Sequence, residues 1–342
     1  METLNRAGIT EKLSASYYLG SGVTGLVPFE VIATKSLDEG SKLPSSFEVV
    51  RDSHSSSLFL ASSETHKKPG DDSVLFILKD DSGQSQIEVV SPDLFIINGP
   101  IDSEGFQDRL PYLFYNLAER ARQEKFELLT AHAAAVSKDG RGILILGDKG
   151  SGKTSIMLAL CLTQGYEMVG NDSVILGTQR ELSVMAGSRQ INVRLPVAKK
   201  LSLPLNEELR KEDQIDYEIK SSFLPEDLGI KANESSNPIS MVVRINLHSD
   251  NPDFVATNIP SLEIEALRLS ENFSRYIRGI PTPLELSSTG IRGYFPDLDS
   301  PELTETRNNV VNALLTQTTY LYVAGNDPTH TAQQLDAIIK KL

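Results

Sequence analysis

Residues 147–154, near the middle of the chain, constrain its fold more than any other segment. They read G-D-K-G-S-G-K-T and fit the pattern G-x-x-x-x-G-K-[S/T]. Glycines let the backbone curl so that successive N–H groups point inward at phosphate oxygens, and the positive end of a following helix adds to this attraction. The apolar run ILIL precedes the loop and SIMLALCL follows it. The sequence therefore predicts a strand–loop–helix unit that holds phosphate groups.

The pattern assigns a role to each polar residue of the loop. Lys153 is expected to reach the β- and γ-phosphates of a nucleotide, and the Thr154 hydroxyl to ligate Mg²⁺. The alternative is a glycine-rich turn with an unrelated lysine, but that alternative leaves the flanking strand and helix unexplained. The predicted nucleotide-binding set comprises Gly147, Asp148, Lys149, Gly150, Ser151, Gly152, Lys153, Thr154 and Ser155.

A Mg-nucleotide site also needs a carboxylate near the metal. Asp172 is the best candidate, because it follows the short apolar strand YEMV that comes directly after the loop helix. If that strand is a parallel neighbour of the strand before the loop, Thr154 and Asp172 meet at one edge of the sheet. Both residues are therefore the predicted metal ligands. The alternative is that Asp172 only caps the turn before SVIL.

The pattern of apolar residues changes along the chain and predicts two regions. Residues 1–110 contain short runs typical of strands, separated by turn residues: FEVIATKSL, SSFEVV, SLFLAS, SVLFILKD, QIEVVS and LFIING. Residues 111–130 carry apolar residues at helical spacing. After them, strands alternate with helices, which indicates an α/β sheet. We expect a β-rich region over 1–110 and a phosphate-loop domain over 111–342.

Residues 203–240 differ in composition from the rest of this second region. They are rich in Glu, Asp, Lys, Ser and Pro and lack apolar periodicity. A mobile insertion over the site and a plain surface excursion explain this composition equally well.

Charge and composition exclude several partners. The formal net charge of −13 disfavours nucleic acid and anionic membranes. No run of about 18 apolar residues is present, so no membrane span is expected. The amino terminus lacks a signal-peptide pattern. The single cysteine, Cys161, lies among apolar residues and is expected in the core. These features predict a cytoplasmic protein.

The segment from His132 through Asp172, HAAAV…GILILGDKGSGKTSIMLAL…GYEMVGND, resembles the catalytic core of HPr kinase/phosphorylases and related proteins with the phosphoenolpyruvate-carboxykinase-type nucleotide fold. In that family a histidine and a small apolar strand precede the loop, and paired aspartates follow the helix. His132, the loop, Gly165 and Asp172 align with this pattern. The resemblance implies an α/β P-loop core with a mixed central sheet that binds ATP and Mg²⁺.

Two departures from the family pattern narrow the expected function. Asn171 replaces the first aspartate, which the family associates with proton transfer, and an amide has no useful basicity at neutral pH. The family's C-terminal segment for recognising its protein substrate has no clear counterpart here. The resemblance thus implies a divergent kinase that phosphorylates a hydroxyl of a small molecule, an amino acid or a peptide. ADP or pyrophosphate as donor, and assembly into a homo-oligomer, are left open.

Two other functions compete with this interpretation. A nucleotide-binding regulatory protein without catalysis is favoured by Asn171. A carboxykinase-like decarboxylase would need several further metal-binding residues, which the sequence does not offer.

Further candidates come from position and resemblance. The resemblance places His132 near the γ-phosphate and the acceptor, where it could position the acceptor hydroxyl or accept its proton; the alternative is a partly buried histidine at a strand entry. Arg189 and Arg194 could clamp an anionic group, or simply lie on the solvent face of a strand. The predicted catalytic set is His132, Lys153, Asn171, Asp172 and Arg194.

Overall fold

The computed structural model contains two compact units. The first comprises Met1–Ser56, Thr65–Leu129 and Phe273–Arg307, and the second Ser57–Glu64, Thr130–Asn272 and Asn308–Leu342. Within them the structure describes residues 17–24, 26–33, 73–80, 86–101, 103, 106, 110–178, 181–205, 220–277 and 299–341. The first unit extends past the boundary expected at residue 110 and includes the following helix, α4 (Leu110–Lys125).

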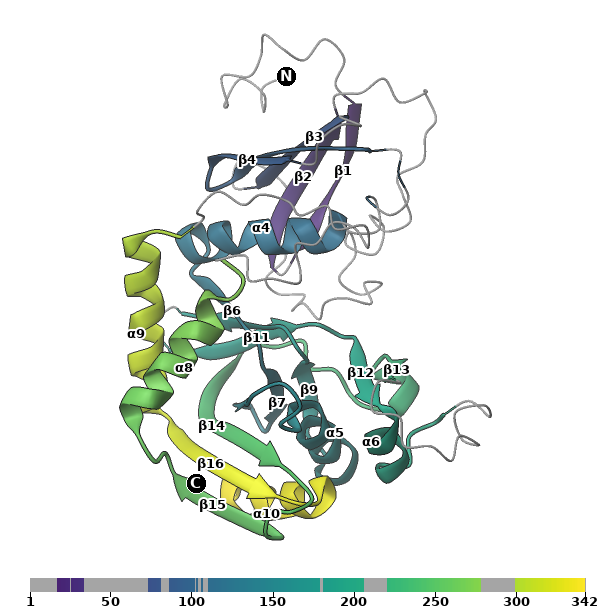
Figure 1. The fold of residues 1–342 in the computed structure, drawn as a ribbon, viewed down its shortest axis with the longest axis vertical. Helices are drawn as coiled ribbons and strands as arrows, with labels where there is room; N and C mark the ends of the chain where they lie inside the picture. The colour runs from purple at the N-terminus through teal and green to yellow at the C-terminus, as the bar shows by residue number, and fades with distance from the viewer. Residues whose placement is uncertain are drawn as a thin grey trace. The chain divides into compact units, whose positions relative to one another are not determined.

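A five-stranded sheet forms the first unit. Its strands lie in the order β1-β2-β3-β5-β4, with β2–β3 and β3–β5 parallel and the two outer pairs antiparallel. Helix α4 lies beside this sheet (Figure 1). Phe114 of the helix stacks on Phe76 of β3 at 4.4 Å between ring centroids. The elements are β1 (Tyr17–Thr24), β2 (Val27–Ala33), β3 (Val74–Asp80), β4 (Gln86–Ser91), β5 (Leu94–Gly99) and α4 (Leu110–Lys125).

The apolar runs predicted most of these elements. The strands expected at FEVIATKSL, SVLFILKD, QIEVVS and LFIING are confirmed as β2 to β5, while SSFEVV and SLFLAS lie outside the described residues. The helix expected over 111–130 is too long, because α4 ends at Lys125 and a strand begins at Leu128. Glu127 adopts a left-handed φ of 53°, which stops the helix despite the apolar residues beyond it.

The second unit is built on a mixed nine-stranded sheet, which confirms the expected mixed α/β class. Its main path is β6-β10-β11-β14-β8-β7-β9, and β16 joins β14 and β15 beside it. The strands are β6 (Leu128–Ala131), β7 (Ala134–Lys138), β8 (Arg141–Leu146), β9 (Glu167–Gly170), β10 (Val174–Gly177), β11 (Ser183–Gly187), β14 (Asn237–Leu247), β15 (Phe254–Asn258) and β16 (Thr319–Gly325).

Helices and a two-stranded sheet complete the second unit. Helix α5 (Lys153–Gln164) ends at Gly165, which has a left-handed φ of 72° and donates its N–H to Leu160, as expected for a C-terminal glycine. The remaining elements are β12 (Ile191–Arg194), α6 (Leu195–Lys200), β13 (Lys220–Phe223), η2 (Glu226–Leu228), α8 (Leu262–Ser274), α9 (Pro301–Gln317) and α10 (Pro328–Ile339); α8 and α9 each cross the boundary between the units.

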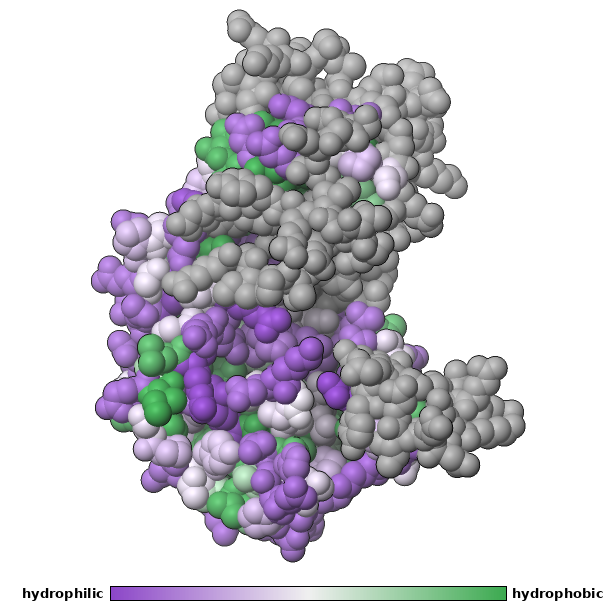
Figure 2. Space-filling view, viewed as in Figure 1, coloured by the Kyte–Doolittle hydropathy of each residue, from purple (hydrophilic) through white to green (hydrophobic). Residues whose placement is uncertain are grey.

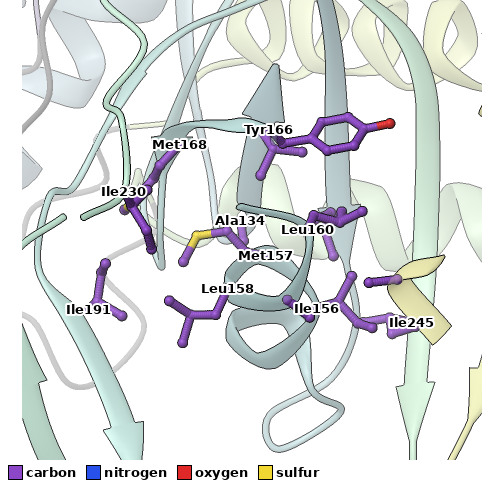
Figure 3. Packing of buried hydrophobic residues seen from close by; sticks show 14 of the residues in the cluster. Ala134, Ile156, Met157, Leu158, Leu160, Tyr166, Met168, Ile191, Ile230 and Ile245 are labelled. Atoms are coloured by element: carbon purple, nitrogen blue, oxygen red, sulfur yellow. The ribbon is translucent and has the colours of Figure 1, made fainter. Parts of the chain in front are cut away.

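The core of the second unit forms around α5. Its apolar side chains belong to one buried cluster with residues of β7, β9, β14 and α10, and Figure 3 shows Ala134, Met168 and Ile245 around this helix. Because the apolar residues of β8 and α5 are buried in this core, the polar loop that joins them is held at one end of both elements. The core therefore fixes the position of the phosphate-binding pattern.

The arrangement of β8 and β9 differs from the prediction. They were expected to be parallel neighbours, but β7 lies between them and pairs antiparallel with both. The cause is the hairpin β7–β8, whose turn at Asp139 and Gly140 has positive φ angles of 52° and 72°. Strands β8 and β9 still run in the same direction, so both end at the same edge of the sheet.

Part of segment 203–240 belongs to these elements. Lys220–Phe223 forms β13, which pairs antiparallel with β12, and β14 starts at Asn237. Residues 206–219 lie outside the described residues. Motion of this segment over the site stays a prediction.

Candidate functional site

The glycine-rich loop connects β8 directly to α5. A Cβ atom on Gly147 would lie 2.2 Å from Ser151 Oγ, and one on Gly152 would lie 2.7 Å from the Leu247 side chain. Both glycines also have positive φ angles, 154° and 96°. The loop is tied to β14, because Leu247 N donates to Ser151 O at 2.8 Å. The glycines are thus needed for a tight curl of the loop against its neighbouring strand.

Lys153, the first residue of α5, folds back onto the loop. Its side chain is buried, and Nζ donates to the carbonyl oxygens of Gly147 at 2.9 Å and Asp148 at 3.1 Å. These two bonds hold the Lys153 ammonium group against the loop backbone. It can exchange carbonyl partners for phosphate oxygens, which are stronger acceptors for an ammonium.

Thr154 connects the loop helix to the end of β9. Its hydroxyl donates to Asn171 Oδ1 at 2.8 Å, and Asn171 is fully buried. Asn171 Nδ2 in turn donates to the Gln190 carbonyl at 3.3 Å, which orients the amide with its oxygen toward Thr154. The structure therefore places Asn171 in contact with the predicted metal-binding hydroxyl.

Asp172 is the centre of a tight turn. Ser173 N donates to Asn171 O at 2.7 Å, and Asp172 between them has a positive φ of 62°. A three-residue turn with positive φ is strained and rare, and such backbone outliers occur preferentially at functional sites. The turn directs the Asp172 carbonyl toward His132, whose Nδ1 lies 2.9 Å away.

This contact fixes the tautomer of the neutral His132 ring. A carbonyl oxygen can only accept, so Nδ1 must carry the hydrogen. The lone pair of the neutral ring is then on Nε2, the nitrogen that can accept a proton. The main chain of His132 is held as well: Asn272 Oδ1 accepts from His132 N at 2.8 Å, and Asn272 Nδ2 donates to His132 O at 2.9 Å.

A buried ion pair lies beside the loop on β14. Arg244 is ion-paired with Glu265 of α8, and Tyr320 of β16 donates to the same carboxylate. Arg244 Nη1 also lies 3.9 Å from Asp148 Oδ1 in the loop. Burial opposes the charge of Arg244, but the contacts with Glu265 and Tyr320 together outweigh burial, so the pKa of Arg244 is raised. Burial, followed by the bond to Glu265, raises the pKa of Tyr320.

The other predicted residues lie in the loop, in the first turn of α5 and in or just before β12. Arg194 ends β12, opposite Lys220 of β13. Arg189 is ion-paired with Glu226 of η2. Lys149 is exposed in the loop, while Ser155 is buried in the first turn of α5.

His132, Thr154, Asn171 and Asp172 thus form one connected group through contacts that the sequence did not predict, the Thr154–Asn171 bond and the His132–Asp172 contact. Sequence reasoning missed Arg244, Glu265 and Asn272. The charged Arg244 within the apolar run MVVRINL is a local signal for a special role. Asn272 gave no such signal, because its partner is 140 residues away.

Cys161 behaves as a core residue. It packs against the buried cluster around α5, and burial raises the pKa of its thiol. Among the described residues, no group of three His, Cys, Asp or Glu side chains is arranged to hold a metal ion. No helix in the described part of the chain has the length and apolar character needed to cross a membrane.

Solved structures, but no family model or curated protein, show similarity to this chain. No protein-family model and no curated protein matches the chain. Among solved structures, the Hpr(Ser) kinase/phosphatase from Coxiella burnetii aligns with 38% of this chain and 72% of that chain, at 20% sequence identity and a TM-score of 0.23. An alignment at this TM-score does not define a common fold.

Proposed function

We propose that the second unit binds Mg-ATP at residues 147–155 and transfers a phosphoryl group to a hydroxyl of a small molecule, an amino acid or a peptide. The observation that carries this proposal is the hydrogen bond between Thr154 and Asn171, which joins the glycine loop to the end of β9. Phosphoryl transfer depends mainly on positioning and charge stabilisation, and this bond joins the two segments that would provide them.

The roles of the side chains follow from their contacts. Lys153 leaves the loop carbonyls and binds the β- and γ-phosphates. Thr154 and Asp172 offer hydroxyl and carboxylate oxygens, the donors that Mg²⁺ prefers, and bound Mg²⁺ would neutralise phosphate charge. His132 Nε2 accepts the proton of the acceptor hydroxyl or positions that hydroxyl. Arg194 is the proposed clamp for an anionic group.

Nucleotide calorimetry tests the proposal. Lys153→Ala and Thr154→Ala should each weaken Mg-ATP binding about tenfold or more, because each removes a charge-assisted or metal contact. The matched controls Lys341→Ala and Thr329→Ala remove exposed residues outside the loop, one after the end of α10 and one in its first turn, and should leave affinity unchanged. Equal affinity in all four variants, with circular dichroism showing intact folds, would refute nucleotide binding at this loop.

One observation favours a second function. Asn171 is the buried partner of Thr154, and as an amide it cannot serve as a base. A regulatory protein that binds nucleotide without transferring phosphate would tolerate this change. Radiolabelled ATP with pools of amino acids, sugars and peptides separates the two: labelled product indicates a kinase, and nucleotide binding without labelled product indicates a regulator.

A further inference from the structure

We infer that Asn272 of α8 is a positioning residue for His132. Through two hydrogen bonds to the main chain of His132, it holds the imidazole against the Asp172 carbonyl and thereby keeps the lone pair of the neutral ring on Nε2. The catalytic role of His132 rests on the proposed function. The effect of Asn272 on the tautomer of His132 can be tested without any activity.

The chemistry of the contact is specific for an amide. Asn272 accepts from an N–H and donates to a C=O of the same residue, at 2.8 and 2.9 Å. A carboxylate can only accept, and an aliphatic side chain can do neither. Among short side chains, only asparagine offers both groups in one plane at this reach.

The position of His132 explains why such a clamp is needed. His132 follows β6, which ends at Ala131, and precedes β7, which begins at Ala134. It therefore lies outside both strands, where sheet pairing no longer provides partners for its main-chain N–H and C=O. Asn272 provides both partners, and a partly buried main chain needs them.

The two main-chain bonds from Asn272 also determine where the His132 ring lies relative to the Asp172 carbonyl. With the main chain fixed by Asn272, the His132 side chain reaches the Asp172 carbonyl at 2.9 Å. Without the clamp, the 132–133 connection can shift and the ring can leave that carbonyl. A displacement of about 1 Å at a reacting group can lower a rate by about 100-fold.

Nitrogen NMR of the His132 ring provides the direct test. Spectra of the full chain are recorded at alkaline pH, where the ring is neutral, and the His132 signals are assigned with a His132→Gln variant. The wild type should show the Nδ1–H tautomer. Asn272→Ala should show a mixture of both tautomers. Asn272→Asp can still accept from His132 N but cannot donate to His132 O, so its Nδ1–H fraction should lie between those of the wild type and Asn272→Ala. Glu271→Gln, exposed on the same helix, is the matched control and should match the wild type.

An unchanged Nδ1–H tautomer in Asn272→Ala would overturn the inference. If Asn272→Ala does not fold, Asn272→Asp decides in the same way: a smaller Nδ1–H fraction supports the inference and an unchanged fraction overturns it.

Turnover provides the second readout, with water as the acceptor. Hydrolysis of Mg-ATP by Asn272→Ala should fall about 10- to 100-fold, while calorimetric Mg-ATP affinity stays within about twofold, because Asn272 contacts His132 and not the loop. A loss of affinity equal to the loss of turnover would indicate a general structural role and overturn the inference. Failure of the wild type to bind Mg-ATP would instead refute the proposed function and leave the tautomer test valid.

Discussion

At the scale of single residues, Asn171 has the most specific environment in the site. Its amide oxygen accepts from the Thr154 hydroxyl, and its amide nitrogen donates to the Gln190 carbonyl. Both contacts occur in a side chain with no exposed surface. The local environment therefore favours a neutral group with one donor and one acceptor, which asparagine supplies and aspartate does not.

Asn171→Asp should destabilise the metal-free protein. The substitution buries a carboxylate and sets an acceptor against the Gln190 carbonyl, so the free energy of unfolding should fall by about 1–3 kcal/mol. Mg-ATP should recover more stability in this variant than in the wild type, because a cation near Thr154 compensates the new charge. Thermal unfolding with and without Mg-ATP measures both effects.

An exposed substitution of the same kind serves as the control for Asn171→Asp. Asn312→Asp adds the same charge at an exposed position of α9 and should change stability little. If Asn171→Asp were as stable as Asn312→Asp without metal, the bond from Asn171 Nδ2 to the Gln190 carbonyl would not be needed for stability.

At the scale of elements, β14 and α8 are linked by a buried charged pair. Arg244 and Glu265 are 7% and 1% exposed, so water solvates their charges little. Removing one partner would leave the other charge buried and uncompensated, which is the costly case. Because β14 also pairs with β8 through the register Arg244↔Leu146, this pair lies next to the start of the loop.

Two arginines near Glu265 allow a matched comparison. Arg244→Met should lower the free energy of unfolding by about 3–5 kcal/mol, since it leaves Glu265 buried without its main partner. Arg268→Met removes an arginine 3.7 Å from the same carboxylate, but that side chain is 48% exposed, so its loss should cost less than about 1 kcal/mol. Urea unfolding measures the loss of stability in both variants. Similar losses would contradict the prediction that the buried Arg244 contributes more than the exposed Arg268.

The sequence predicted elements where the signal is local. The strand before the loop, the apolar helix α5 and its end at Gly165 each follow from a short pattern. The end of α4 was misplaced, because the positive φ of Glu127 outweighed the apolar residues that follow it. The separation of β8 and β9 by β7 depends on strand pairing between distant segments, which no local pattern encodes.

The same limit applies to the site. The loop residues were predicted because they are consecutive, whereas Asn272 reaches His132 across 140 residues and Glu265 reaches Arg244 across 21. Such contacts depend on how α8 packs in the folded chain. A single sequence contains no periodicity that could reveal them.

At the scale of the whole molecule, acidic charge dominates. The chain carries a formal net charge of −13, and the described surface of the second unit seen in Figure 2 is mostly hydrophilic with small, separated hydrophobic areas. As the pH falls, protonation of Asp and Glu side chains first reduces their mutual repulsion, which stabilises the fold. At lower pH it also neutralises carboxylates that make stabilising contacts, which destabilises the fold. The contribution of a single carboxylate to the free energy of unfolding must therefore be measured as the difference between a variant and the wild type at each pH.

Asp336 should make the second unit sensitive to acid. It lies on α10, where its carboxylate accepts from Tyr166 Oη at 3.1 Å and pairs with Lys138 at 3.6 Å and Lys340 at 2.6 Å. Burial alone would raise the pKa of Asp336, but the bonds from Lys340 and Tyr166 and the charges of Lys138 and Lys340 together outweigh burial, so the pKa is lowered. A lowered pKa in the folded state means that the ionised form stabilises the fold.

This stabilisation is fully present above the unfolded-state pKa, about 4, and is lost as the pH falls through the lower folded-state pKa. Asp336→Asn should therefore be less stable than the wild type at pH 7, and the difference should shrink as the pH falls below about 4. Urea unfolding of both proteins across this range measures the difference. Asp250→Asn, whose side chain is 85% exposed in the wild type, is the control and should show little difference at any pH. A constant deficit for Asp336→Asn down to the lowest pH would mean that shape and hydrogen bonding, rather than the charge of Asp336, hold α10 to the sheet.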